Sequence, residues 1–243
     1  MILNLNSTIG KINTWESIMI DLKNKIIIFD NIKTGSTSIR SILERNSNCF
    51  FGKHTKLVTE SFMYFDHDKD SKVFTCQKLY EKYKKNITNS IFIDKEDIVK
   101  NFIKAASVRN PYDRLFSLYR YRINKNSQLV KGMSLNKQDF EKYIIKICND
   151  PYFEKTNGLS LASNIAISNK EFLDLNHIIR FEKYEKDIKK FFKKINIDID
   201  TIPHKKKTVK NFNFKDFYSK KSVDLVNEHY EKDFIYFNYK MIK

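Results

Sequence analysis

Three short apolar runs along the chain are each followed by a segment whose apolar residues recur at helical spacing. The runs are KIIIFDNI (25–32), NFIKAASV (101–108) and NHIIRF (176–181). Apolar, β-branched runs of this length predict strands that are buried in a sheet. The segments that follow them predict helices that each bury one face. These segments are TSIRSILERN, PYDRLFSLYRYR and EKYEKDIKKFFKKI.

Strands that alternate with helices predict an α/β fold: a three-layer sandwich with a mainly parallel central sheet, the architecture of P-loop-type nucleotide kinases. Asn110 and Pro111 fit the cap and the first position of the second helix. VDLVNEHYEKDF (223–234) predicts a last helix. Five glycines and three prolines in 243 residues leave no room for a flexible linker, so we expect one domain over residues 1–243.

The net charge of +16 raises the question of a nucleic-acid partner. Only seven of the 45 basic residues are arginine, while 24 residues of the chain are asparagine. An AT-rich genome produces this excess, so the total charge does not by itself indicate nucleic acid. The position of the arginines is more informative, because Arg109, Arg114, Arg120 and Arg122 lie within fourteen residues. The planar fork of arginine suits bidentate anion binding.

Cysteine usage and apolar patterning indicate the compartment. The three cysteines have no metal-type spacing, and their odd number argues against a disulfide framework. The N-terminal residues do not have the basic and apolar regions of a signal peptide. No stretch approaches the ~20 apolar residues that span a bilayer. We therefore expect a cytoplasmic protein with no transmembrane segment.

A small polar turn, KTGSTS (33–38), joins the first predicted strand to its helix. A strand–turn–helix unit offers backbone amides and the positive end of the helix dipole to an anion. One ammonium and four hydroxyls add to these donors. The turn does not have the nucleotide-loop order G-x-x-x-x-G-K-[ST], because its lysine precedes its glycine. A capped helix start explains the same residues, so the turn alone does not decide for an anion site.

A second strand–helix junction, SVRNPYDRLFSLYRY (107–121), carries Arg109 directly after the strand and Ser117 two helical turns later. In a parallel sheet both junctions lie at the carboxyl edge, where such folds bind ligands. Two anion sites at one edge indicate a ligand with phosphates at both ends.

KTGSTSIRSIL followed by VRNPYDRLFSLY resembles the sulfotransferases that use 3′-phosphoadenosine 5′-phosphosulfate (PAPS), particularly their carbohydrate-directed, bacterial-like branch. IIRFEKYEKDIKKFF and YEKDFIYFNY are similar to later segments of that family, so the resemblance covers most of residues 25–240. The resemblance implies transfer of a sulfuryl group from this nucleotide donor to a hydroxyl acceptor. The resemblance favours a carbohydrate as the acceptor and implies that the reaction requires no metal ion.

The resemblance also implies roles for individual residues. Lys33 matches the lysine that stabilises the bridging oxygen as sulfate leaves, and Arg109 and Ser117 match the pair that holds the 3′-phosphate. The other predicted donor-binding residues are those of the first turn, Thr34, Gly35, Ser36, Thr37 and Ser38. A surface ion pair for Arg109 and a solvated side chain for Ser117 are the competing interpretations.

A hydroxyl acceptor needs a group that takes its proton during in-line attack. Five histidines are candidates: His54, His67, His177, His204 and His229. We expect His54 to be this base, because bacterial-type relatives carry a KH pair there and an unperturbed imidazole titrates near neutral pH. The alternatives are Glu60, Asp66 and His67, and a capping or surface role for His54 also stays open.

Two segments and two other functions also stay open. Residues 66–100 are either an insertion that shapes the acceptor site or a sign that His54 is wrongly aligned. The basic run HKKKTVK (204–210) closes over the nucleotide, meets an acidic glycan or is a solvated loop.

An ATP-dependent nucleotide or small-molecule kinase is a competing function, although the Gly-Lys-Ser/Thr order that such an enzyme needs is missing. A non-catalytic nucleic-acid-binding module competes as well, but the sequence has no recognisable motif of that kind, so we expect no nucleic-acid partner.

Overall fold

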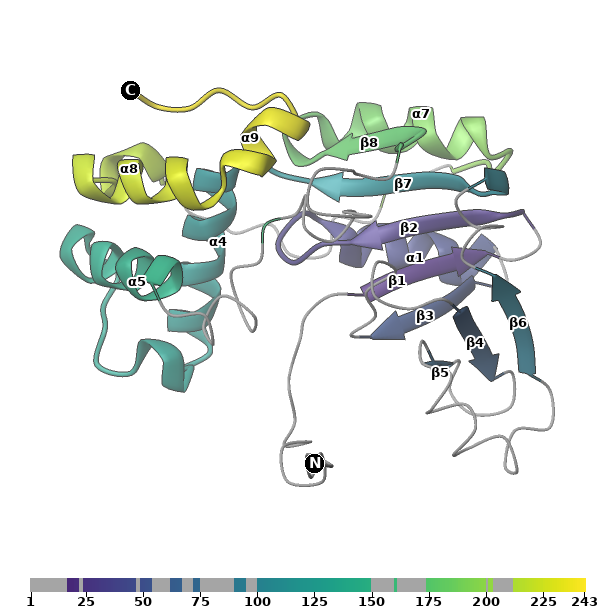
Figure 1. Cartoon of the computed structure of the whole chain (residues 1–243), viewed down its shortest axis with the longest axis horizontal. Coiled ribbons are helices and arrows are strands. Elements are labelled where there is room, and N and C mark those ends of the chain that lie inside the picture. The colour runs from purple at the N-terminus through teal and green to yellow at the C-terminus, as the bar shows by residue number, and fades with distance from the viewer. Residues whose placement is uncertain are drawn as a thin grey trace, which may run out of the picture.

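The computed structural model describes residues 17–21, 24–46, 49–53, 62–66, 72–74, 90–94, 100–149, 160, 174–199, 201–202 and 212–243. Its centre is a five-stranded sheet (Figure 1). The strands, in their order across the sheet, are β3 (Cys49–Lys53), β1 (Ser17–Asp21), β2 (Ile26–Asp30), β7 (Ile103–Val108) and β8 (His177–Arg180).

The three predicted strands are confirmed as the parallel part of this sheet. β2 pairs in parallel with β7, and β7 pairs in parallel with β8. The side chains of residues 26–29 in β2 alternate between the two faces of the sheet, and none is more than 4% exposed. A parallel sheet is covered on both faces, which explains why this strand has an unbroken apolar sequence. The predicted α/β class is confirmed.

β1 and β3 add an antiparallel edge that the sequence analysis does not predict. β1 pairs antiparallel with both β2 and β3. Near the end of β1, Asn24 donates its backbone and side-chain N–H groups to the Asp21 carboxylate at 3.0 and 2.7 Å. These bonds support the return of the chain into β2.

The helices that follow β2 and β8 share one apolar core with the sheet. They are α1 (Ser36–Asn46) and α7 (Tyr184–Lys194). Both occupy positions that the sequence predicts as helical. The core contains residues from both helices and from the sheet: Ile39, Ile42 and Leu43, then Ile188, Phe191 and Phe192, then Ile28, Ala105 and Ile179.

A second, aromatic-rich core lies among helices on the side to which β7 points (Figure 1). These helices are α4 (Pro111–Asn124), α5 (Lys137–Asn149), α8 (Lys220–His229) and α9 (Glu231–Tyr236). The predicted start of α4 is confirmed, because Pro111 is its first residue and the Asn110 side chain caps it. α4 therefore connects the sheet edge to the aromatic-rich core.

The prediction of one last helix over residues 223–234 is wrong, because the chain forms two helices that meet at Tyr230. The Tyr230 N–H donates to the Val226 carbonyl at 3.0 Å and ends α8. The Tyr230 carbonyl accepts the N–H groups of Asp233 and Phe234 at 2.9 and 3.2 Å and begins the next turn. Tyr230 therefore uses its backbone N–H in one helix and its carbonyl in the next, while its side chain stays buried.

Part of the predicted 66–100 insertion belongs to a separate antiparallel sheet. Its strands, in their order across the sheet, are β5 (Lys72–Phe74), β4 (Phe62–Asp66) and β6 (Ser90–Asp94). Among the helices of the described residues, none has both the length and the apolar character required to cross a bilayer.

Candidate active site

The turn between β2 and α1 has a backbone conformation that few residues adopt. Lys33 and Gly35 have positive φ angles of 65° and 88°. A Cβ atom on Gly35 would lie 2.6 Å from Cε2 of Tyr184, and the Tyr184 hydroxyl donates to the Gly35 carbonyl. Both the φ angle and the close ring require glycine at this position.

Thr34 attaches this turn to the neighbouring strand. Its buried hydroxyl donates to the Asn31 carbonyl at 2.6 Å and lies 2.6 Å from the Ser107 hydroxyl. Because a hydroxyl has one proton, Ser107 is the donor in the second contact. The Asn31 side-chain amide donates to the Ser107 carbonyl at 2.8 Å. Thr34 therefore offers no hydroxyl proton to an anion, and its side chain fixes the turn to β7.

The remaining predicted residues of the turn form the start of α1. Ser36 is the first residue of the helix and is half-buried, Thr37 is exposed and Ser38 is buried. The Ser38 N–H donates to the Gly35 carbonyl at 3.1 Å. The positive end of the α1 dipole thus lies at this turn, where it favours an anion.

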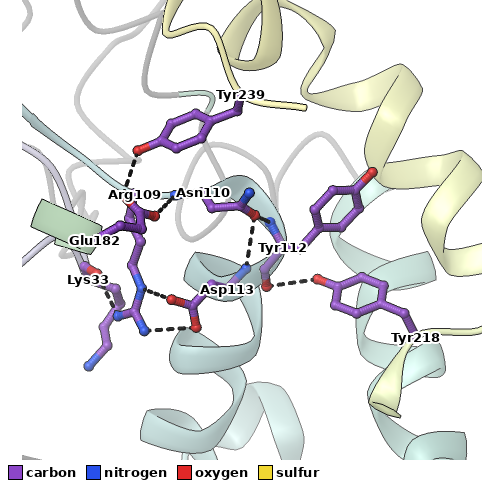
Figure 2. Close-up of polar contacts among 8 residues, drawn as sticks. All are labelled: Lys33, Arg109, Asn110, Tyr112, Asp113, Glu182, Tyr218 and Tyr239. Carbon is purple, nitrogen blue, oxygen red and sulfur yellow. Dashed lines mark hydrogen bonds and ion pairs between the residues drawn. The ribbon is translucent and has the colours of Figure 1, made fainter. Parts of the chain in front are cut away.

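Arg109 follows β7 directly and is held on three sides, two of them by the polar partners that Figure 2 shows. Its Nε and Nη2 donate to the two carboxylate oxygens of Asp113 at 2.7 and 2.9 Å. Its Nη1 donates to the Lys33 carbonyl at 3.1 Å. The ring of Phe181 lies 3.9 Å from the guanidinium carbon. The contact with Lys33 confirms that the two predicted anion turns lie together at one edge of the sheet.

Three residues of α4 lie along the side of the helix that faces these turns. Asp113, Ser117 and Tyr121 are spaced four residues apart, which places them above one another on a helix. Asp113 contacts Arg109, and the ring of Tyr121 lies 4.8 Å from the Lys33 ammonium. Ser117 is half-buried between them on the same side. This placement fits the predicted role of Ser117 in the site.

The third parallel strand brings residues that the sequence analysis does not assign to the site. The short helix η5 (Phe181–Lys183) follows β8. Glu182 accepts the Asn110 backbone N–H at 2.6 Å and the Tyr239 hydroxyl at 3.0 Å (Figure 2). Burial, followed by the charge of Glu182, raises the pKa of Tyr239, which therefore stays protonated as a donor. For Glu182, its position directly after a predicted parallel strand was the available signal, whereas Tyr239 carries no such signal.

The positive charges at this edge repel one another. Burial, followed by the charge of Arg109, lowers the pKa of Arg120, while the carboxylate of Asp113 acts in the opposite direction. The guanidinium of Arg120 also lies 4.7 Å from the Phe212 ring and 5.8 Å from the Phe116 ring. An anion bound among these cations would relieve their repulsion.

The predicted base His54 lies outside the described residues, as do Glu60, His67, His204 and the basic run 204–210. Of Asp66, the structure describes only the backbone, as the last residue of β4. The assignment of the base among these residues remains a prediction.

Two of the five candidate histidines, His177 and His229, are among the described residues. His177 is the first residue of β8, at the opposite end of the strand from Arg180. Its Nε2 contacts the Asp187 carbonyl at 3.1 Å, and burial lowers its pKa. His229 ends α8 and packs edge-on against Tyr230. Both positions fit structural roles.

The match to a known family agrees with this geometry. Residues 16–240 match a family model described as the sulfotransferase family. No curated protein and no solved structure matches the chain at a significant level. The matched region takes in both predicted anion turns, the helix α1 and the third strand junction. This chain therefore belongs to the sulfotransferase family and is a transferase.

Proposed function

We propose that this protein transfers a sulfuryl group from PAPS to a hydroxyl group of a carbohydrate. The observation that carries the donor assignment is the 3.1 Å hydrogen bond from Arg109 Nη1 to the Lys33 carbonyl. It supports two anion-binding turns side by side, which suits a nucleotide with anionic groups at both its 3′ and 5′ positions.

In this proposal the two ends of the donor bind to different turns. Arg109 and Ser117 bind the 3′-phosphate, because arginine offers paired donors to a phosphate and the serine lies on the adjoining face of α4. Lys33, Gly35 and the first residues of α1, 36–38, bind the 5′-phosphosulfate, with Thr34 contributing through its backbone. The exposed and half-buried hydroxyls of Thr37 and Ser36 are available donors.

The proposed reaction is an in-line displacement at sulfur. The acceptor oxygen forms a new S–O bond while the bond from sulfur to the bridging oxygen of the donor breaks. His54 takes the proton of the acceptor hydroxyl, and the Lys33 ammonium stabilises the charge that develops on the leaving phosphate oxygen. The protein mainly positions the reactants and neutralises charge, as in phosphoryl transfer.

We further propose that the reaction takes place in the cytoplasm, in one domain over residues 1–243, and that it needs no metal ion. The ammonium of Lys33 supplies the positive charge that a divalent cation supplies in a kinase. This gives the proposal a clear contrast with ATP-dependent phosphoryl transfer.

A transfer assay tests the proposal. The full chain is incubated with PAPS and separate panels of carbohydrates, glycolipids, lipid alcohols and small hydroxylated metabolites, with and without EDTA. We expect acceptor-dependent release of 3′-phosphoadenosine 5′-phosphate and a sulfated carbohydrate, both insensitive to EDTA. Phosphorylation of an acceptor by ATP and magnesium, without any sulfation, would overturn the proposal. Sulfation of another acceptor class would overturn only the carbohydrate assignment.

A further inference from the structure

We propose that Asp113 is a positioning residue for the 3′-phosphate site: its carboxylate turns the Arg109 guanidinium so that the terminal N–H groups face the nucleotide. This inference rests on the proposed PAPS donor. It assigns a specific task to a carboxylate that lies among the cations of an anion site, where a negative charge would otherwise be unfavourable.

The contact between the two side chains is bidentate. Asp113 accepts one hydrogen bond from Nε at 2.7 Å and one from Nη2 at 2.9 Å. The Asp113 side chain is 24% exposed and the Arg109 side chain is 12% exposed. Solvent therefore screens this ion pair less than it screens a pair on the open surface. A paired carboxylate on this edge of the guanidinium fixes the rotation of the whole group.

Two further contacts hold the same group from other directions. The Lys33 carbonyl accepts a hydrogen bond from Nη1, and the Phe181 ring covers one face of the guanidinium at 3.9 Å. The carboxylate and the carbonyl define the plane of the guanidinium, and the ring stacks on it (Figure 2 shows the two polar partners). The orientation of Arg109 is therefore set before a ligand arrives.

Within the described part of the chain, the hydrogen bonds of Arg109 leave it a pair of N–H groups that suits a phosphate. Arginine has five N–H bonds, one on Nε and two on each terminal nitrogen. Among the described residues, Asp113 and the Lys33 carbonyl accept one hydrogen from Nε, one from Nη1 and one from Nη2. Each terminal nitrogen thus has a second N–H, and this pair matches two oxygens of a phosphate.

Loss of the carboxylate would also change the balance of charge around Arg109. The charge of Arg109 and the charge of Asp113 act on Arg120 in opposite directions. Without the carboxylate, the two guanidinium groups repel each other with less compensation. Arg109 then has fewer restraints, and the stronger repulsion from Arg120 favours its displacement.

Positioning and simple charge predict opposite results for one substitution. If Asp113 only repels or competes with the phosphate, Asp113→Asn removes a negative charge and tightens nucleotide binding. If Asp113 positions Arg109, the same substitution weakens binding, because the amide can accept only one of the two hydrogen bonds. The sign of the change therefore separates the two roles.

The experiment measures the dissociation constants of 3′-phosphoadenosine 5′-phosphate and adenosine 5′-phosphate by calorimetry, for the wild type, Asp113→Asn and Asp113→Glu. We expect Asp113→Asn to weaken binding of the first nucleotide by about tenfold, the lower end of the loss when an orienting partner is removed at metal sites. Binding of adenosine 5′-phosphate, which has no 3′-phosphate, stays unchanged. Asp113→Glu keeps the carboxylate and recovers part of the loss.

A matched control is Asp224→Asn, which removes another carboxylate paired at the i,i+4 spacing, at 3.2 Å from Lys220 on the exposed face of α8. It leaves both constants unchanged. Equal or tighter binding of 3′-phosphoadenosine 5′-phosphate by Asp113→Asn overturns the positioning role while leaving the donor assignment intact. A wild type that binds the two nucleotides equally well overturns the donor assignment, and the inference with it. Thermal unfolding of each variant without nucleotide identifies a loss caused by misfolding, in which case Asp113→Glu decides.

Discussion

At the scale of single residues, Lys33 has a structural function in the turn and a chemical function in the proposed reaction. Its positive φ angle of 65° directs the chain through the turn, and its carbonyl accepts the hydrogen bond from Arg109. Its ammonium lies 4.8 Å from the centroid of the Tyr121 ring, a distance suited to a cation–π contact. The backbone therefore joins the two turns while the side chain supplies the charge.

The chemical function of Lys33 predicts that its removal affects turnover more than binding. In Lys33→Ala, the negative charge on the leaving oxygen loses its stabilising partner, so we expect kcat to fall by about 100-fold or more. The dissociation constant for the donor changes much less, because the backbone contacts remain. Steady-state kinetics and calorimetry measure the two effects, with exposed Lys220→Ala as the control. An unchanged turnover in Lys33→Ala would refute the leaving-group role.

Gly35 offers a test of the close contact with Tyr184. Gly35→Ala and Gly132→Ala both place a side chain at a positive φ angle, 88° and 78°, which costs about 1–2 kcal/mol. Only at Gly35 does the new Cβ meet another residue, at 2.6 Å from the Tyr184 ring, whereas nothing lies within 4 Å at Gly132. We expect the free energy of unfolding, measured in urea, to fall further in Gly35→Ala. Equal losses in the two variants would show that Tyr184 moves aside freely.

At the scale of elements, α4 links the anion site to the aromatic-rich core. Its N-terminal cap, Asn110, separates Arg109 from the helix and also donates its backbone N–H to Glu182. The opposite side of the helix is buried in the core through Leu115, Phe116 and Tyr119. A disturbance at the start of α4 should therefore reach the site.

The cap of α4 can be tested against the cap of α8. Asn110→Ala removes an oxygen that accepts the N–H groups of Tyr112 and Asp113, and Ser219→Ala removes the cap of α8. Each substitution should lower the free energy of unfolding by about 1 kcal/mol. Only Asn110→Ala should also weaken binding of 3′-phosphoadenosine 5′-phosphate, because Arg109 and Asp113 flank it. Equal effects of both variants on nucleotide binding would contradict this link.

At the scale of the whole molecule, the parallel centre was predictable because its signals are local. Residues 26–29 are apolar without a break, and Asn110 with Pro111 marks a helix start. The antiparallel strand β3 was not predictable in the same way, because its partner β1 lies far from it in the chain. β1 itself pairs with β2 across the short connection between Asp21 and Ile26, a local signal that the sequence predictions left unused. α5 shows helical spacing in Phe140, Tyr143, Ile144 and Ile147, a signal that the sequence analysis leaves unused.

The same distinction explains which parts of the site the sequence revealed. Lys33, Arg109 and Ser117 stand in two short motifs directly after predicted strands. The contacts of Glu182 with Asn110 and Tyr239 join residues 72 and 57 positions apart, and no local pattern encodes them. The sequence therefore identified the residues proposed to bind the donor, while the structure was needed for the residues that contact and hold them.

We propose that one edge of the sheet binds a nucleotide through both its 3′ and 5′ anionic groups. The most direct measurement is thermal unfolding with 3′-phosphoadenosine 5′-phosphate, beside adenosine 5′-phosphate and ATP. A ligand at about a hundredfold excess over its dissociation constant adds about 2.7 kcal/mol of stability. For a domain of this size the melting temperature then rises by roughly 5–11 °C. We expect a rise of this size with 3′-phosphoadenosine 5′-phosphate and much smaller shifts with the other two nucleotides at the same concentration. Equal shifts with all three nucleotides, or no shift with any, would contradict binding through both anionic groups.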